Sequence, residues 1–394
     1  MVLQTIKRAR RLEGKTVLVR VDYNVPMNKG KVLDDTRLRA SIPTIEYLVQ
    51  KGAKVVLAAH LGRPEGKWDK TLSTKPLVKH LSALLGYSVR HIPALAGPSA
   101  FKHIKKMNSG DVALLENMRY SPEEEGNKGV FAASLAAMAD IFVMDGFGVA
   151  HRGDASVVGT ALYIPAYAGL LIEKEIKGLD RLINAPKHPF IALIGGAKMD
   201  TKLPVIEALA KKATNILVGG GIVTTILAAE GYDVGASIKE DHLFAAAKAL
   251  RKKKNILMPV DLVIGKKNGK GAEVVDVGSA PHALCADNEA VFDIGPKTQA
   301  MYEAIIASAK TLMWNGAMGY MEQSPYDTGT NAIAIALANQ SSAGAYTVIG
   351  GGETIESMEA LSLIEHIDHV STGGGAMLSY LAGEDLPGIL IVNS

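Results

Sequence analysis

Short, continuously apolar runs alternate along the whole chain with longer segments in which apolar and charged residues are mixed. In the first part of the chain the apolar runs are residues 15–23, 53–60, 111–118 and 140–147. They lack the strict apolar–polar alternation of a half-exposed strand, so both of their faces should be buried. Helical patterns such as residues 37–52 and 129–139 separate them. This alternation predicts an α/β, doubly wound fold with parallel sheets.

The later part of the chain repeats the scheme. Its apolar runs are residues 190–196, 215–221, 255–265, 310–316, 345–352 and 369–375. The basic, glycine-rich stretch at residues 266–271 is predicted to be the tip of a hairpin.

A boundary is predicted between the two parts. Residues 168–189 read as a charged amphipathic helix that ends near Pro186, because the residue before a proline disfavours the helical conformation. We therefore expect two Rossmann-like lobes joined by a hinge helix. The expected ranges are residues 1–170 for the first lobe, 171–185 for the hinge helix and 186–378 for the second lobe.

Composition narrows the class of protein. The chain has 394 residues, more than one core usually fills, which agrees with two lobes. A net charge of +3 is small for this size, so nucleic acid is not an expected partner, although small anions are. Cys285 is the single cysteine, and no apolar run reaches transmembrane length. With no apolar signal segment at the start, we expect a soluble cytoplasmic protein with no membrane partner.

Charged residues follow the predicted strands of the first lobe. In open α/β sheets, ligands bind beyond the carboxyl ends of the strands. The residues at these ends include Arg20, Asp22, Asn24, Arg37, His60, Arg63, Arg119, His151 and Arg152. The planar fork of arginine binds carboxylate and phosphate oxygens in pairs, so this edge predicts a basic cleft for a small anion. Structural pairing with a nearby Asp or Glu is open for any one arginine, but it does not account for all of them.

Glycines follow the predicted strands of the second lobe instead. The clusters are Gly195-Gly196, Gly219-Gly220-Gly221, Gly350-Gly351-Gly352 and Gly373-Gly374-Gly375, each before a helical pattern. Glycine lets a phosphate or a flat base approach the backbone closely. Lys198 and Lys202 follow the first cluster one helical turn apart. A single cluster could be a plain turn, whereas four with lysines predict a nucleotide site.

Common fingerprints do not fit the chain. Residues 62–68, GRPEGKW, lack the spacing of a P-loop, and Thr224, Ile355 and Leu378 stand where a dinucleotide motif would have its last glycine. Neither a zinc-type spacing nor a hydrolase nucleophile elbow is present in the sequence. One lobe for a small anionic acid and one for a nucleotide together predict phosphoryl transfer, which needs positioning and charge neutralisation more than covalent help.

The motifs resemble those of the phosphoglycerate kinase family, in that family's order and over nearly the whole chain. They are residues 20–26, 60–64, 116–120, 195–203, 218–222, 293–298, 314–319, 349–354 and 371–376. The resemblance implies a glycolytic and gluconeogenic phosphotransferase that moves the acyl phosphate of 1,3-bisphosphoglycerate to MgADP, giving 3-phosphoglycerate and MgATP. It also implies a monomer, in-line transfer when the lobes close, and a C-terminal tail over residues 379–394 that packs back on the first lobe.

The resemblance assigns roles to matching residues. Those implied to bind the acid and its phosphate are Asp22, Asn24, Arg37, His60, Arg63, Arg119 and Arg152. Those implied to bind the nucleotide are Gly196, Ala197, Lys202, Gly219, Gly220, Asn315, Glu322 (on the ribose), Gly350, Gly351, Gly352, Glu353 and Thr354. Glu353 would hold Mg²⁺, directly or through water. Those implied to neutralise the moving phosphoryl group are Arg37, Lys198, Gly373, Gly374 and Gly375. The acceptor is a carboxylate, already ionised, so no general base is needed.

Three departures from the family pattern accompany the resemblance. Ala317 stands where proline is usual, Glu353 stands where aspartate is usual, and the sequence of residues 148–156 around Arg152 differs from the family pattern. We keep Arg152 as a ligand and His151 as a structural residue. Two alternatives remain open at this point, a non-catalytic sensor of a phosphorylated acid and a nucleotide, and a related kinase for another carboxylate or acyl phosphate.

Overall fold

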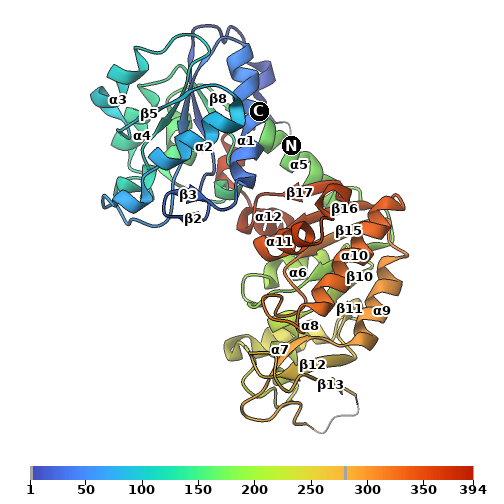
Figure 1. Cartoon of the computed structure of the whole chain (residues 1–394). Helices are drawn as coiled ribbons and strands as arrows, with labels where there is room; N and C mark the ends of the chain where they lie inside the picture. Colours follow the sequence, from blue (N-terminus) through green and yellow to red (C-terminus); the bar gives the residue numbers. More distant parts are fainter. Residues whose placement is uncertain (1–2, 279–281, 394) are drawn as a thin grey trace. The chain divides into compact units, whose positions relative to one another are not determined.

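The computed structural model describes residues 3–278 and 282–393, and the chain divides into two compact units (Figure 1). Unit 1 comprises Met1–Lys177 with Asp385–Ser394, and unit 2 comprises Gly178–Glu384. Parts of the predicted ranges, namely residues 1, 2, 279–281 and 394, lie outside the described residues. Helix α5 (Leu170–Ile183) carries the chain from unit 1 into unit 2.

The core of unit 1 is a parallel sheet with the strand order β5-β6-β4-β1-β7-β8. The strands are β1 (Thr16–Arg20), β4 (Lys54–Ala58), β5 (Val89–Ile92), β6 (Val112–Leu115), β7 (Ile141–Met144) and β8 (Ala166–Ala168). β6 and β7 are buried at every residue, as their continuous apolar runs predicted. The edge strands β5 and β8 were not predicted, since β5 exposes the polar Arg90 and β8 is short.

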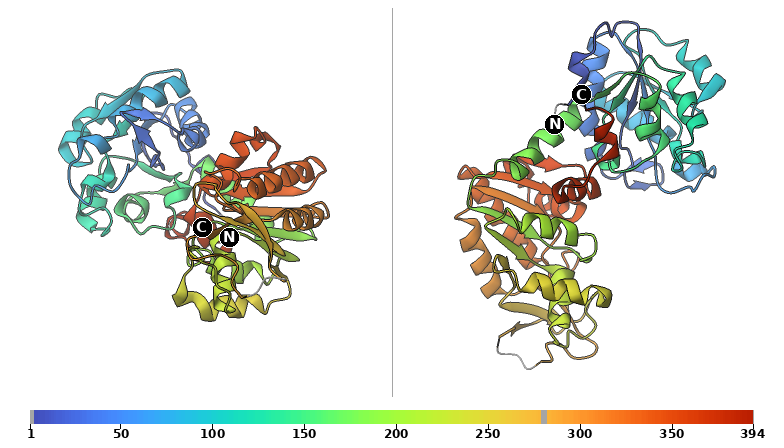
Figure 2. Two further views of the ribbon diagram at one scale, coloured as in Figure 1. Left: turned by 60° about the horizontal axis from the view of Figure 1, so that its bottom comes forward. Right: turned by 180° about the vertical axis from the view of Figure 1, so that it is seen from behind.

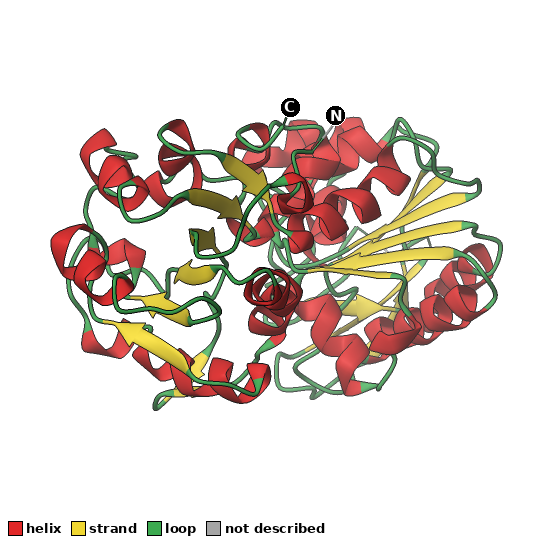
Figure 3. Cartoon of the chain, turned by 90° about the horizontal axis from the view of Figure 1, so that it is seen from above, coloured by secondary structure: helices red, strands yellow, loops and turns green. Residues whose placement is uncertain are grey.

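Helices flank this sheet (Figure 3). They are α1 (Thr36–Gln50), α2 (Lys75–Leu85), α3 (Gly97–Ile104) and α4 (Gly129–Ala136). The short helical turns of unit 1 are the 3₁₀ turns η1 (Ile6–Arg8), η2 (Lys70–Leu72), η3 (Met118–Tyr120), η4 (Phe147–Val149) and η6 (Thr160–Leu162) and the π turn η5 (Ala155–Gly159). A small hairpin is formed by β2 (Met27–Asn28) and β3 (Lys31–Val32). α1 buries Leu38, Ile45 and Leu48 at helical spacing, which is the apolar stripe that packs on the core.

The C-terminal segment belongs to unit 1. Its helix α13 (Pro387–Leu390) places the Gly388 N–H 2.9 Å from the carbonyl oxygen of Ala150. Leu3 and Asn393 form an antiparallel bridge, so the two ends of the chain lie side by side (Figure 2).

Unit 2 contains a second parallel sheet with the strand order β11-β10-β9-β15-β16-β17. These strands are β9 (Phe190–Ile194), β10 (Asn215–Val218), β11 (Ile256–Leu257), β15 (Thr311–Asn315), β16 (Tyr346–Gly350) and β17 (His369–Ser371). The helices are α6 (Leu203–Leu209), α7 (Gly220–Ala229), α8 (Phe244–Arg251), α9 (Pro296–Ile306), α10 (Thr328–Ser342), α11 (Gly352–Ala360) and α12 (Gly375–Ala382), with η7 (Asp241–Leu243) and η8 (Ile364–His366). The predicted α/β class with doubly wound parallel sheets is confirmed.

A smaller antiparallel sheet, β13-β12-β14, adds to unit 2. Its strands are β12 (Asp261–Gly265), β13 (Glu273–Asp276) and β14 (Ala290–Ile294). The prediction of one strand over residues 255–265 is wrong, because β11 ends at Leu257 and the chain joins the other sheet as β12 from Asp261. Pro259 lies between the two strands and has no N–H for a sheet ladder. The predicted hairpin tip is confirmed, since Lys266 N–H bonds Lys270 O between β12 and β13.

Among the residues described, no helix has both the length and the apolar character needed to cross a membrane.

Candidate active site

The strand ends of unit 1 bring the predicted acid-binding residues to one edge of the sheet. Arg20 is paired with Ala58 of β4 and Met144 of β7, so the loops after these strands start at the same level. One Arg37 amino group bonds Asn24 O at 2.8 Å and lies 3.1 Å from the Asp22 carboxylate. Arg37 thus lies in the first turn of α1 beside the end of β1, where its partly exposed guanidinium still has room for an anion.

The loop after β4 is held from two sides at Gly62. Asn24 Oδ1 accepts from Gly62 N–H at 2.9 Å, and the Arg119 guanidinium donates to Gly62 O at 3.0 Å. The exposed Arg63 is the next residue along this loop. Asn24 and Arg119 therefore fix the backbone from which Arg63 extends.

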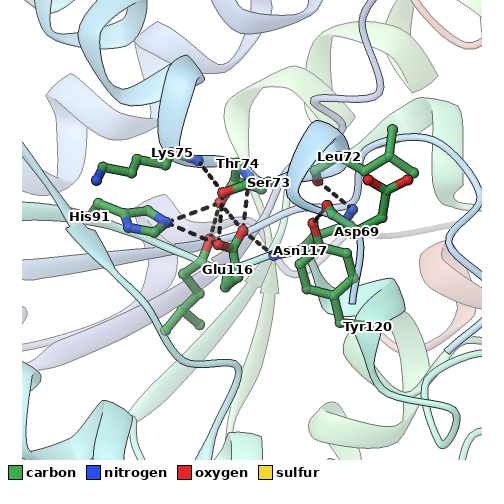
Figure 4. A network of polar contacts seen from close by, with 10 residues as sticks. Asp69, Leu72, Ser73, Thr74, Lys75, His91, Glu116, Asn117 and Tyr120 are labelled. Atoms are coloured by element: carbon green, nitrogen blue, oxygen red, sulfur yellow. Dashed lines mark hydrogen bonds and ion pairs between the residues drawn. The ribbon is translucent and has the colours of Figure 1, made fainter. Parts of the chain in front are cut away.

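A buried polar network anchors both ends of the same loop (Figure 4). Asn117 Nδ2 donates to Leu61 O at 2.7 Å and to Leu72 O at 2.9 Å, and its Oδ1 accepts from the Arg119 N–H at 3.1 Å. Glu116 accepts from the backbone N–H of Thr74 at 2.8 Å, at the start of α2. Our prediction did not assign roles to these two residues, although polar side chains directly after a fully apolar strand were a usable signal.

His60, Arg37, Arg119 and Arg152 come together around one point. Burial, followed by the positive charges of Arg20 and these three arginines, holds the pKa of His60 well below its ordinary value. Burial also lowers the pKa of the Arg119 guanidinium, and the charge of Arg152 lowers it further. Asp22 pairs with Arg37 and Glu125 pairs with Arg119, but the positive charge that still acts on His60 favours an acidic ligand.

In unit 2, the strand ends also share one edge, since Asn315 is paired with Ile194 of β9 and Gly350 of β16, and Gly350 with Ser371 of β17. Asn315 at the end of β15 and residues 316–318 after it join the glycine loops through backbone hydrogen bonds. The bonds are Gly195 N to Asn315 O at 3.0 Å, Gly196 N to Ala317 O at 2.7 Å and Gly220 N to Met318 O at 2.9 Å.

Several of these glycines are needed for contact between loops rather than for a ligand. A Cβ on Gly195 would overlap the carbonyl oxygen of Ala317, and one on Gly221 would overlap that of Ala197. By contrast, a Cβ on Gly352, Gly374 or Gly375 would have no heavy atom within 4 Å. In the third cluster a Cβ on Gly350 would overlap Met377. The close-approach argument for a ligand therefore applies to Gly352, Gly374 and Gly375, while Gly195, Gly221 and Gly350 have a packing reason.

A cavity of about 470 Å³ opens in unit 2. Predicted residues on its wall are Gly196, Ala197, Gly220, Glu322 and Glu353. The lining also contains apolar residues of β14 and the loop after β15, including Val291, Phe292 and Met321, which were not predicted. Buried Asn315 and Thr354 are not on this wall; they hold the surrounding loops, with Asn315 Nδ2 bonding Gly350 O and Thr354 Oγ1 accepting from Gly316 N–H, both at 2.7 Å. An apolar slot with a few polar groups suits a nucleoside.

Lysines lie beside this cavity. Lys202 Nζ donates to Asn315 Oδ1, and burial lowers the pKa of Lys202, opposed by the negative charge of Glu353. Lys198 is exposed on the loop before α6, and Glu240 supports that loop by accepting from the N–H of Met199. Glu240 was not predicted, because it is distant in sequence from the loop it holds.

Glu353 lies at the start of α11 and bends toward the loop after β15. Its Oε2 accepts from the Ala317 N–H at 3.4 Å, a bond that proline at this position could not make. Within the described chain, no group of three or more His, Cys, Asp or Glu residues could hold a metal by itself. One carboxylate beside a cavity fits Mg²⁺, which is commonly held by one or two carboxylates, water and the phosphates of a nucleotide.

The last predicted cluster precedes α12. Gly374 has φ +52°, a left-handed conformation that favours glycine, and Gly375 begins the helix. Gly373 N–H bonds Ser371 Oγ at 3.1 Å, which anchors the turn to β17. The helix N-terminus then directs positive dipole toward the space that Gly374 and Gly375 leave open.

Comparison with known proteins covers both units. The model of the phosphoglycerate kinase family matches residues 6–384. The structure of phosphoglycerate kinase from Coxiella burnetii is 35% identical, with 99% of this chain and 99% of that chain covered and a TM-score of 0.84. The crystal structure of phosphoglycerate kinase from Pyrococcus horikoshii OT3 is 33% identical, with 99% of this chain and 98% of that chain covered and a TM-score of 0.87.

Proposed function

The chain belongs to the phosphoglycerate kinase family, and we propose that its units divide the family's reaction, with the three-carbon acid on unit 1 and the nucleotide on unit 2. The reaction follows from the family: the acyl phosphate of 1,3-bisphosphoglycerate passes reversibly to ADP, giving 3-phosphoglycerate and ATP. The protein is thus a glycolytic phosphotransferase with a carboxyl group as acceptor. The predicted family, activity and enzyme class are confirmed.

The observation that supports the role of unit 1 is the gathering of Arg37, Arg119 and Arg152 around buried His60. A phosphate and a carboxylate on one small molecule need several fixed cationic donors, and arginine supplies them in pairs. We assign Asp22, Asn24 and Arg63 to the same site: Asp22 and Asn24 hold Arg37, and Arg63 extends from the loop that Asn24 and Arg119 fix.

The nucleotide role of unit 2 is supported by the cavity between the glycine loops and β14. We assign its apolar wall to the base and Glu322 to the ribose. The phosphates would meet Lys202, Thr354 and the glycine loops of residues 350–352 and 373–375, in which Gly352, Gly374 and Gly375 leave open space. Mg²⁺, when bound, supplies charge neutralisation at the nucleotide phosphates, and Glu353 would hold it directly or through water.

The transfer step needs charge neutralisation at the phosphoryl group rather than proton abstraction, because the acceptor carboxylate is already ionised. We assign that neutralisation to Arg37, Lys198 and the glycine turn of residues 373–375 at the start of α12. Each unit holds one reactant, so we propose that the units close to bring the reactants in line and exclude water. We further propose that the protein acts on small molecules as a cytoplasmic monomer.

The test is ATP consumption with 3-phosphoglycerate, with and without Mg²⁺, coupled to reduction of the acyl phosphate product. We expect metal-dependent turnover. Binding of both ligands without turnover would favour the sensor. Faster turnover with another carboxylic acid would establish a kinase for that acid.

A further inference from the structure

The contact between Arg20 and His60 determines which ring nitrogen of the neutral imidazole carries the proton. The guanidinium Nη2 of Arg20 lies 3.2 Å from His60 Nδ1. Arginine in proteins always donates and never accepts. Nδ1 must therefore be the acceptor in this pair, which leaves the proton of a neutral imidazole on Nε2.

The guanidinium itself is held on its other sides. Arg20 is fully buried; its Nε donates to Ser156 Oγ at 2.7 Å, and its Nη1 donates to Val21 O. Ser156 Oγ donates in turn to the carboxylate of Glu124, which is also fully buried and accepts from the Ser156 N–H at 3.0 Å. Ser156 Oγ accepts from Arg20 and so has its own proton left for the Glu124 carboxylate, and the guanidinium is held by Ser156 and by Val21 O while it donates to Nδ1.

The other ring nitrogen of His60 points to an unmet interaction. Nε2 is buried and has no hydrogen-bond partner among the residues that the structure describes. The charged groups that act on the ring are Arg20 of β1, Arg37 of α1, Arg119 of η3 and Arg152 in the loop after η4. All four are cations, so protonation of the ring is disfavoured from each element around it.

We propose that Arg20 is a positioning residue that fixes His60 as the neutral Nε2–H tautomer, a hydrogen-bond donor for an oxygen of the bound acid. The arginines supply the charge, and His60 supplies one directed donor whose strength does not depend on pH in the neutral range. The identity of the acid rests on the proposed function, but the state of the imidazole does not.

The direct experiment is long-range ¹H–¹⁵N correlation of ¹⁵N-histidine-labelled protein without ligand, with the His60 signals assigned by their loss in His60→Gln. We expect the neutral Nε2–H pattern from about pH 6 to about pH 8, the range in which ordinary histidines titrate. An Nδ1–H pattern, or an imidazolium at about pH 7, would overturn the proposal. This measurement uses the unaltered protein, so it does not depend on any variant folding.

A second experiment removes the donor. Arg20→Met combined with Glu124→Gln avoids leaving a buried charge unpaired. We expect mixed tautomers of His60 and a roughly tenfold higher KM for 3-phosphoglycerate with a much smaller change in kcat. Arg39→Met, which removes an exposed arginine of α1, should change neither. An unchanged His60 spectrum in the double variant would overturn the role of Arg20. If the unaltered protein shows the Nε2–H form of His60 but does not phosphorylate 3-phosphoglycerate, only the proposed function is overturned.

Discussion

Units 1 and 2 share a doubly wound parallel sheet but build their candidate sites from different parts of the chain. In unit 1 the candidate site consists of charged side chains, and other side chains support the backbone or the partners of these residues. Asn117 bonds the loop that carries Arg63, and Glu124 accepts from Ser156, which in turn accepts from Arg20. In unit 2 the site consists largely of backbone, because loops such as residues 315–318 bond directly to the glycine loops. The comparison shows that the same fold can build a candidate binding site either from charged side chains or from closely packed loop backbone.

The difference agrees with the ligands that we propose for the two units, a small acid for unit 1 and a nucleotide for unit 2. A small molecule with two anionic groups offers little surface, so it must be read by charge, and buried charges need supporting partners. A nucleoside offers a large flat surface, which is read by shape, and shape is set by how closely the backbone segments approach. Side-chain substitutions should therefore change ligand binding in unit 1, while the addition of a single methyl group should already disturb unit 2.

Lys198 tests whether a residue outside both binding sites serves the transfer step, and it has the largest expected effect. Lys198→Ala should lower kcat roughly 100-fold or more, because a contact made to the moving phosphoryl group is lost. Binding of 3-phosphoglycerate, measured by calorimetry, should stay unchanged. Lys211→Ala removes another exposed lysine of unit 2 and is the matched control. Equal losses in rate and binding would contradict the assignment of Lys198 to the moving group.

Gly221 and Gly352 test the claim that backbone packing shapes unit 2. A methyl group on Gly221 would overlap Ala197 O, so Gly221→Ala should lower the free energy of unfolding by about 1–3 kcal/mol, measured by urea denaturation. The methyl group of Gly352→Ala would have no heavy atom within 4 Å, so this substitution should change the free energy of unfolding by less than about 0.5 kcal/mol. It should still weaken ADP binding. Similar stability losses in both variants would remove the distinction between packed and open glycines.

Arg63 tests the side-chain character of unit 1. Arg63→Ala should raise the half-saturating concentration of 3-phosphoglycerate about tenfold, the loss expected for one charge-assisted hydrogen bond, with kcat nearly unchanged. Steady-state kinetics measures both values. Arg90→Ala is the control, because Arg90 is an exposed arginine of the same unit that pairs with Asp111. A half-saturating concentration that does not move would show that Arg63 has only a structural role.

The sequence predicted the parts of each site that follow from topology. Once the strands of a sheet are parallel, the residues after them gather at one edge of that sheet, as Arg37 and His60 do in unit 1 and Glu353 does in unit 2. The motifs identified the family. The supporting contacts could not be predicted, because Asn117 and Leu61 are 56 positions apart and Ser156 and Glu124 are 32 apart. No local pattern specifies such pairs. The break at Pro259 was visible in the sequence, but the apolar run around it masked the change of sheet.

The departures at positions 317 and 353 form one contact, which gives the smallest expected effect. Ala317→Pro removes the N–H that Glu353 accepts at 3.4 Å, so the carboxylate loses its anchor at the edge of the cavity. The gain in ADP affinity that Mg²⁺ provides should then shrink two- to fivefold, as expected for a hydrogen bond of about 0.5–1 kcal/mol. Calorimetry of ADP binding with and without Mg²⁺ measures this gain. Ala317→Ser keeps the N–H and should behave like the parent. If the proline and serine variants bind alike, the contact has no role, and the backbone of unit 2 then shapes the slot without orienting its one acidic side chain.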